Sequence, residues 1–194
     1  MTAREDRPAA LPPPDAASLH EAALNYLARY AATEAGLRRV LVRRIDRWSR
    51  LQPDPDAAEP VVLAARSALD AVVKRLAEAG AINDSAFAEN RVRSLVRSGQ
   101  STRSIQMRLV AKGVAPDMAR AAANTDAETE LAAALVLAWK RRIGPYRVAE
   151  TADAMARMKE MGVLARAGFS RDVAEKVLET SPEEAEKRIF ELRR

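Results

Sequence analysis

One turn pattern occurs three times along this chain and constrains its fold more than any other feature. It reads Leu-x3-Gly-x3-Asp, with Ala two positions after each Asp, and spans residues 76–84, 109–117 and 164–172. In a helical protein, Leu packs the last turn of a helix and Gly ends that helix in the left-handed conformation. Asp then lies at the N-cap or in the first turn of the next helix, where the helix dipole favours negative charge. The pattern predicts small helical modules built on one plan, although any helical protein can reuse a Gly-ended helix.

The composition also indicates helices. Hydrophobic residues make up 48% of the 194 residues, but aromatic residues only 4%, and there are seven glycines. This mixture favours helix and disfavours strand, so we predict an all-α fold. Two apolar stripes have helical spacing: Leu37, Leu41, Ile45 and Trp48 in a helix over about residues 33–48, and Ala88, Val92, Leu95 and Val96 in a helix opening at Asp84.

Prolines and turn signals divide the chain into segments. Residues 1–17 read as a disordered Pro- and Ala-rich arm, and residues 52–60, PDPDAAEP with its preceding Gln, as a loop that interrupts any helix. Ser181 and Pro182 have the order of an N-cap and a first helical residue. The predicted segments are a first helical module over 18–79 that contains the loop, a second over 80–125, a third over 126–181 and a C-terminal helix over 182–194.

The residues needed for catalysis or metal binding are scarce. The chain has no Cys and one His, His20, which reads as a solvated residue near the start of a helix. Cys–His pairs and multi-histidine metal sites cannot be built from this set, and no phosphate-binding loop motif is present. We therefore expect no enzyme activity, no metal and no cofactor. The lack of Cys, of a secretory signal and of a long apolar run favours the cytoplasm, without membrane contact.

Positive charge is concentrated in two segments. Residues 20–50 carry seven Arg against three acids, residues 91–112 carry five Arg and one Lys against none, and residues 147–194 balance ten against ten. Arg suits phosphates and carboxylates because its guanidinium donates two parallel hydrogen bonds. The predicted contact residues are Arg91, Arg93, Arg97, Ser101, Arg103, Arg108 and Lys112, followed by Arg39, Arg43 and Arg47. The alternative is that these stripes are only the solvated faces of helices.

Four segments of the chain resemble those of one known protein family. GAINDSAFAEN at 80–90, followed by Arg91 and Arg93, is similar to one family segment, and the stretch from Gly99 through Lys112 to Val114 is similar to a second. Residues 23–41 and 165–178 resemble the entry and exit segments of the family. The family that these segments resemble is RecX, bacterial regulatory proteins of the RecA recombinase, and the resemblance covers about residues 20–180.

This resemblance implies a fold and a partner. The expected fold is three tandem three-helix modules in an elongated, curved arrangement. The expected partner is the RecA filament on single-stranded DNA, which the chain, acting as a monomer, would occupy and in most cases inhibit in strand exchange, ATP hydrolysis and coprotease activity. Two alternatives stay open: a basic helical module that binds DNA directly without RecA, as helix-turn-helix proteins do, and a helical scaffold for other proteins.

Overall fold

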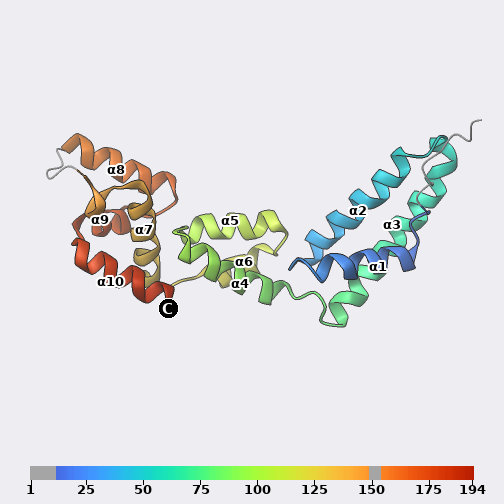
Figure 1. Ribbon diagram of the computed structural model, residues 1–194, viewed down its shortest axis with the longest axis horizontal. Coiled ribbons are helices and arrows are strands. Elements are labelled where there is room, and N and C mark those ends of the chain that lie inside the picture. The colour runs from blue at the N-terminus through green and yellow to red at the C-terminus, as the bar shows by residue number, and fades with distance from the viewer. Residues whose placement is uncertain (1–11, 149–153) are drawn as a thin grey trace, which may run out of the picture. The chain divides into compact units, whose positions relative to one another are not determined.

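The computed structural model describes residues 12–148 and 154–194, and every regular element within these ranges is helical, as predicted (Figure 1). The chain divides into two compact units, one ending at Asp84 and one over Ser85–Arg194. The first unit contains α1 (Ala16–Leu27), α2 (Glu34–Arg50) and α3 (Pro55–Glu78). The second contains α4 (Asp84–Arg97), α5 (Thr102–Lys112), α6 (Pro116–Ala123), α7 (Ala127–Arg141), the 3-10 turn η1 (Gly144–Tyr146), α8 (Ala154–Arg166), α9 (Arg171–Glu179) and α10 (Pro182–Arg193).

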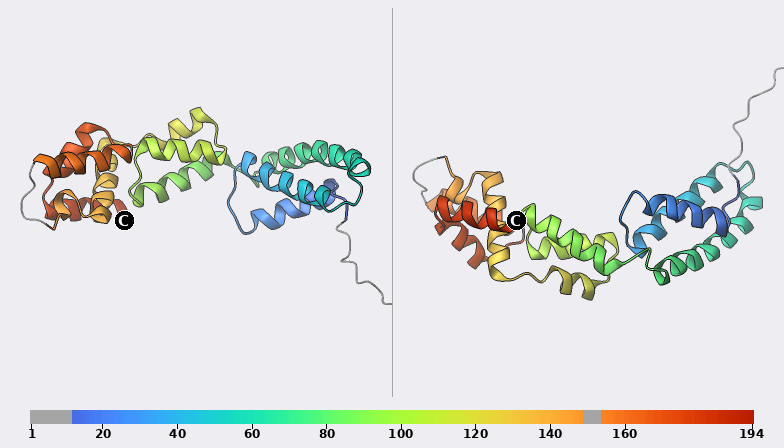
Figure 2. Two further views of the ribbon diagram at one scale, coloured as in Figure 1. Left: turned by 90° about the horizontal axis from the view of Figure 1, so that it is seen from above. Right: turned by 60° about the horizontal axis from the view of Figure 1, so that its bottom comes forward.

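The first unit is built around the long helix pair α2 and α3, which lie side by side with α1 across them (Figures 1 and 2). The predicted stripe of α2 is confirmed, because Leu37, Leu41 and Ile45 are fully buried and Trp48 is 7% exposed. Leu37, Leu41 and Ile45 form one core with Leu69, Val72, Val73 and Leu76 of α3 and with Leu19 and Ala23 of α1. Periodic burial on three helices therefore makes one small core, as expected for amphipathic helices.

The first unit starts earlier than the sequence suggested. Residues 1–11 of the predicted arm lie outside the described residues, but Pro14 is buried and Asp15 caps α1. Asp15 Oδ1 accepts a hydrogen bond from the Ser18 N–H at 2.8 Å, and Ser18 Oγ accepts one from the Asp15 N–H at 3.0 Å. The prediction of disorder is therefore wrong for residues 12–17, because a reciprocal capping box orders this segment.

The predicted loop at 52–60 is also largely a helix. Asp54 Oδ1 accepts hydrogen bonds from the N–H groups of Asp56 and Ala57 at 3.0 and 3.2 Å, and α3 begins at Pro55. Proline is tolerated at this first position because its missing N–H would have no partner there. Pro60 lies in the second turn, where it removes one intrahelical hydrogen bond while the rest of α3 buries its apolar face. The loop prediction therefore holds only for residues 52–54.

The boundary after the first module lies later than residue 79. Ile82 is 5% exposed and belongs to the first core, and Asp84 Oδ1 accepts a hydrogen bond from the Glu34 N–H at 2.9 Å. This bond ties Asp84 to the start of α2, within the first unit. The first compact unit accordingly runs to Asp84.

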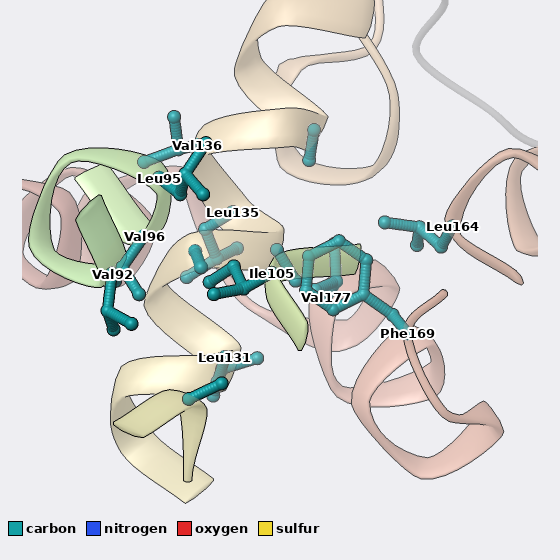
Figure 3. Close-up of a cluster of buried hydrophobic side chains, with 14 of the residues drawn as sticks. Val92, Leu95, Val96, Ile105, Leu131, Leu135, Val136, Leu164, Phe169 and Val177 are labelled. Atoms are coloured by element: carbon teal, nitrogen blue, oxygen red, sulfur yellow. The ribbon is translucent and has the colours of Figure 1, made fainter. Parts of the chain in front are cut away.

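The second unit has α7 at its centre. Residues 131–136 of α7 are all buried, a pattern typical of a helix covered on most sides. In Figure 3, side chains of α4, including Leu95 and Val96, lie on one side of α7, and Phe169 and Val177 lie on the other. Ala185 and Ile189 of α10 belong to the same core. The sets α4–α6 and α7–α10 therefore share one hydrophobic core.

Polar side chains cap or brace several helices of the second unit. Asp126 caps α7 through the Thr129 N–H at 2.7 Å, and this hydrogen bond lowers the pKa of the Asp126 carboxyl below its usual value. Arg147 Nε donates to Glu160 Oε1 of α8 at 2.8 Å, and Glu160 is 8% exposed. The hydrogen bond to Glu160 raises the pKa of Arg147, and the side chains of the pair are 22% and 10% exposed. Ser181 caps α10 and Pro182 opens it, as predicted.

The recurring turn has one geometry at all three places. Gly80, Gly113 and Gly168 have φ of 73°, 99° and 93°. The N–H that follows each Gly donates to the carbonyl of the Leu four residues before that Gly, at 2.9, 3.1 and 3.2 Å. This bond is the signature of a Schellman helix end, and the Asp of each repeat lies in the first turn of the following helix. The predicted turn is therefore confirmed at the level of individual hydrogen bonds.

Candidate basic interface

The turn between α4 and α5 is packed tightly against the backbone of α7. Gly99 has a φ of 81°, and a β-carbon placed on it would lie 2.9 Å from the Leu137 nitrogen and 3.1 Å from the Ala133 oxygen. No other residue fits this space without moving a helix backbone. Lys140 Nζ donates to the Ser98 carbonyl oxygen at 2.8 Å, next to this contact. The C-terminal ends of α4 and α7 therefore meet at the turn.

Ser101 holds this turn against a second one. Its Oγ accepts a hydrogen bond from the Ser104 N–H at 3.2 Å and donates one to the Ala167 carbonyl at 2.6 Å. The side chain is fully buried, and a β-carbon on Gly168 would lie 2.6 Å from its Oγ. Ser101 was predicted to lie on a contact face, but here its buried hydroxyl caps α5 and joins the two Gly-containing turns, so we treat it as a structural residue.

Basic side chains surround these two turns. Arg103, in the first turn of α5, is exposed, and its Cβ would lie 3.5 Å from a β-carbon on Gly168. Beside the same turn is a groove of about 350 Å³ between α7 and α8, lined by Leu137, Arg141, Val163, Arg166 and Ala167. We define the basic junction as Arg97, Arg103, Lys140, Arg141 and Arg166. It combines two residues predicted from the sequence, Arg97 and Arg103, with three that the sequence did not indicate.

The arginines of the basic junction have no carboxylate partner within the described residues. Other arginines of the second unit form ion pairs: Arg120 with Asp117, Arg147 with Glu160, Arg157 with Glu179, Arg171 with Glu175, and Arg188 with Glu128 and Glu184. The nearby acid Glu130 instead accepts hydrogen bonds from Thr102, its backbone N–H at 3.1 Å and its hydroxyl at 2.7 Å. The junction therefore keeps a positive field that is available to an external anion.

The other predicted residues of this unit do not form one face. Arg93 and Arg97 are one turn apart on the exposed side of α4, whereas Arg91 is rotated by roughly 200° from Arg93. Arg108 Nε donates to Ser104 Oγ at 3.3 Å, and Lys112 lies one turn further along the same side of α5. Arg103 lies on a different side of α5. The exposed cations of the predicted segment thus point in several directions.

The second predicted group lies in the first unit. Arg39, Arg43 and Arg47 are all exposed on α2, opposite its buried stripe. Arg43 and Arg47 also border a groove beside Trp48. None of the described helices is long and apolar enough to cross a membrane.

The fold and the basic junction define a class of protein: three-helix sets with a cluster of exposed arginines that have no carboxylate partner among the described residues. A family model described as the second three-helix domain of RecX matches residues 83–122, which contain α4, α5 and all of α6 but its last residue. The curated Regulatory protein RecX of Myxococcus xanthus (strain DK1622) is 38% identical over 166 residues, which cover 84% of this chain and 86% of that protein. The chain belongs to the RecX family, as the sequence resemblance indicated.

Two further comparisons agree with this assignment. The Regulatory protein RecX of Agrobacterium fabrum (strain C58 / ATCC 33970) is 43% identical over 106 residues, which cover 55% of this chain and 56% of that protein. The crystal structure of RecX from Lactobacillus salivarius matches with a TM-score of 0.62 at 22% identity, over 85% of this chain and 95% of that one. The structural likeness shows that the two chains share the helical fold.

Proposed function

We propose that this chain is a non-enzymatic regulator that binds the RecA filament on single-stranded DNA and inhibits its ATPase, strand-exchange and coprotease activities. The observation that carries the proposal is the basic junction, whose arginines have no carboxylate partner among the described residues. Membership of a family of regulatory proteins supports the choice of partner. We also propose that the chain acts as a monomer in the cytoplasm and needs no cofactor.

The proposed mechanism is occupation of the filament by a rigid positive surface. Guanidinium groups donate paired hydrogen bonds to phosphate or carboxylate oxygens, so Arg97, Arg103 and Arg166 suit the DNA backbone or an acidic protein face. The buried Ser101 and the close contact at Gly99 hold the helix ends that carry these arginines. Arg91, Arg93, Arg108 and Lys112 stay proposed contacts on neighbouring faces.

The test is single-stranded-DNA-dependent ATP hydrolysis by RecA, titrated with the purified chain. Inhibition at a stoichiometric ratio is expected, and no effect at that ratio would refute the proposed function. Replacing Arg97, Arg103 and Arg166 by Gln should weaken inhibition by at least about tenfold. The matched control replaces three arginines of exposed ion pairs, which contribute little to stability: Arg120, Arg157 and Arg171. Equal losses in both variants would show that total charge matters and the junction does not.

Direct binding to DNA is the second candidate, because unpaired arginines also suit phosphates without a protein partner. It predicts measurable affinity for single-stranded DNA in the absence of RecA. The logarithm of the association constant should then fall by about 0.7 per phosphate contact for each unit of log salt concentration. Tight, salt-sensitive DNA binding without any effect on RecA would favour this candidate over the first.

A further inference from the structure

The first unit contains a groove of about 360 Å³ that plays no part in the basic junction. One wall is α2, which contributes Val40, Trp48 and three arginines, and the other is the segment that leads into α1, which contributes Pro12 and Pro14. Pro14 is buried, so this segment is fixed to the unit. Proline restricts φ, and a wall made of prolines loses little freedom when a ligand binds. The groove is therefore largely preformed.

The charge of the groove is uniform. Arg43, Arg44 and Arg47 line it, and no described acidic residue lines it or forms an ion pair with these three. Two acids near the middle of α2 have other partners: Asp70 pairs with Arg38, and Asp46 pairs with Arg66 at 3.1 Å. Three arginines within about one helical turn thus line a partly apolar groove, and no carboxylate of the described part of the chain pairs with them.

The apolar part of the groove suits an aliphatic side chain better than a nucleobase. Stacking of a base requires an open aromatic face, but Trp48 is only 7% exposed. The remaining apolar surface comes from Val40 and the two proline rings, which are aliphatic. A ligand that matches both parts has an aliphatic group in the groove and anionic groups on either side of it.

We propose that this groove binds an acidic peptide segment of a partner protein, with one leucine-like side chain in the groove and its flanking carboxylates on Arg43, Arg44 and Arg47. Charge complementarity selects the flanks, since the guanidinium fork binds carboxylates in a bidentate manner. Burial of the aliphatic side chain supplies the remaining affinity. This site is independent of the function proposed above, because it lies in the other compact unit and requires neither RecA nor DNA.

The experiment uses the full chain and a fluorescent Glu- and Asp-rich peptide with one central Leu. Binding is followed by fluorescence anisotropy and, in the Trp139→Phe protein, by the emission of Trp48. We expect saturable binding that falls at least about tenfold when Arg43, Arg44 and Arg47 are replaced by Gln. A peptide with Ser in place of Leu should bind about tenfold more weakly.

A matched variant separates the groove from general electrostatics. Arg29, Arg50 and Arg75 are exposed arginines of the same unit that do not line the groove, and replacing them by Gln changes the net charge equally. This control should bind the peptide as the parent does. Equal losses in the two variants, equal binding of the Ser peptide, or no saturable binding would each overturn the proposal. Tighter binding of a single-stranded oligonucleotide with the same arginine dependence would overturn it in favour of a nucleic-acid site.

Discussion

Replacement of Ser101 by Ala tests whether this residue is structural or a contact with the partner. The sequence placed Ser101 on a binding face, whereas the structure buries its hydroxyl between two turns. The substitution removes only the Oγ, so charge and helix propensity change little. It deletes the N-cap bond from Ser104 and the bond to the Ala167 carbonyl, whose oxygen lies 2.6 Å away.

The expected cost is the sum of these two bonds. Loss of a Ser N-cap costs about 1 kcal/mol. Loss of the hydrogen bond that joins the turns costs about 1 kcal/mol more, since the Ala167 carbonyl has no replacement donor on the alanine side chain. The free energy of unfolding of the second unit should therefore fall by about 2 kcal/mol.

Urea unfolding measures this change if the fluorescence comes from the second unit alone. In a Trp48→Phe background, Trp139 is the remaining tryptophan and reports on α7. The unfolding midpoint should fall by about 1 M for an m-value near 2 kcal/mol per M. The control is Ser104→Ala on the same helix, whose half-exposed hydroxyl bonds to Gln100 at 3.1 Å, and it should change stability by less than about 0.5 kcal/mol.

Unchanged stability with weaker inhibition would support the prediction from the sequence that Ser101 contacts the partner. If Ser101→Ala unfolds at the same urea concentration as its parent but inhibits RecA more weakly, Ser101 contacts the partner and the packing described above does not matter for stability. A loss of stability with unchanged inhibition, measured below the unfolding transition, would confirm the structural role.

Three further substitutions, one of them with a matched control, have expected outcomes. Gly99→Ala should lower the free energy of unfolding by at least about 2 kcal/mol in urea titrations, because Ala is strained at φ 81° and its Cβ would approach α7. Glu160→Gln should cost about 3 kcal/mol by leaving the Arg147 charge shielded and unpaired, whereas Glu179→Gln, in an exposed pair, should cost less than about 0.5 kcal/mol. Asp126→Ala should lower the melting temperature at pH 7, and the difference from the parent should shrink as pH falls below 3.8 through the lowered pKa, since only the ionised carboxyl caps α7 strongly.

Much of the fold followed from local patterns in the sequence. Burial of Leu37, Leu41 and Ile45 could be predicted because a helix repeats every 3.6 residues. The three turns could be predicted because a left-handed helix end favours Gly. The start of α3 could not, since the cluster at 53–60 has the composition of a loop, and only the cap by Asp54 shows that a helix begins inside it.

The candidate site was less predictable. The spacing of residues shows on which side of a helix a side chain lies, but it does not show which other elements of the fold cover that side. Ser101 and Ser104 have the same side-chain chemistry and lie three residues apart, yet Ser101 is buried under the turn at Ala167 and Ser104 is half exposed. Arg166 was missed for a related reason. It belongs to a segment with zero net charge, and it joins the basic junction only through tertiary packing.

The composition of the basic junction has a physical origin in the helix ends themselves. Arg97, Arg141 and Arg166 each lie in the last turn of a helix. A cation at this position interacts favourably with the helix dipole and stabilises the helix by a few tenths of a kcal/mol. These helix ends meet because the turns after α4 and α8 pack together through Ser101, and the turn after α4 packs on α7 through Gly99. Each of these cations stabilises its own helix, but the packing of the helix ends brings them together. Because the cations repel one another, binding of an anion among them is favourable. A single Arg→Gln change at the junction should therefore alter stability slightly and partner affinity more strongly, whereas the same change at a paired arginine such as Arg157 should alter neither.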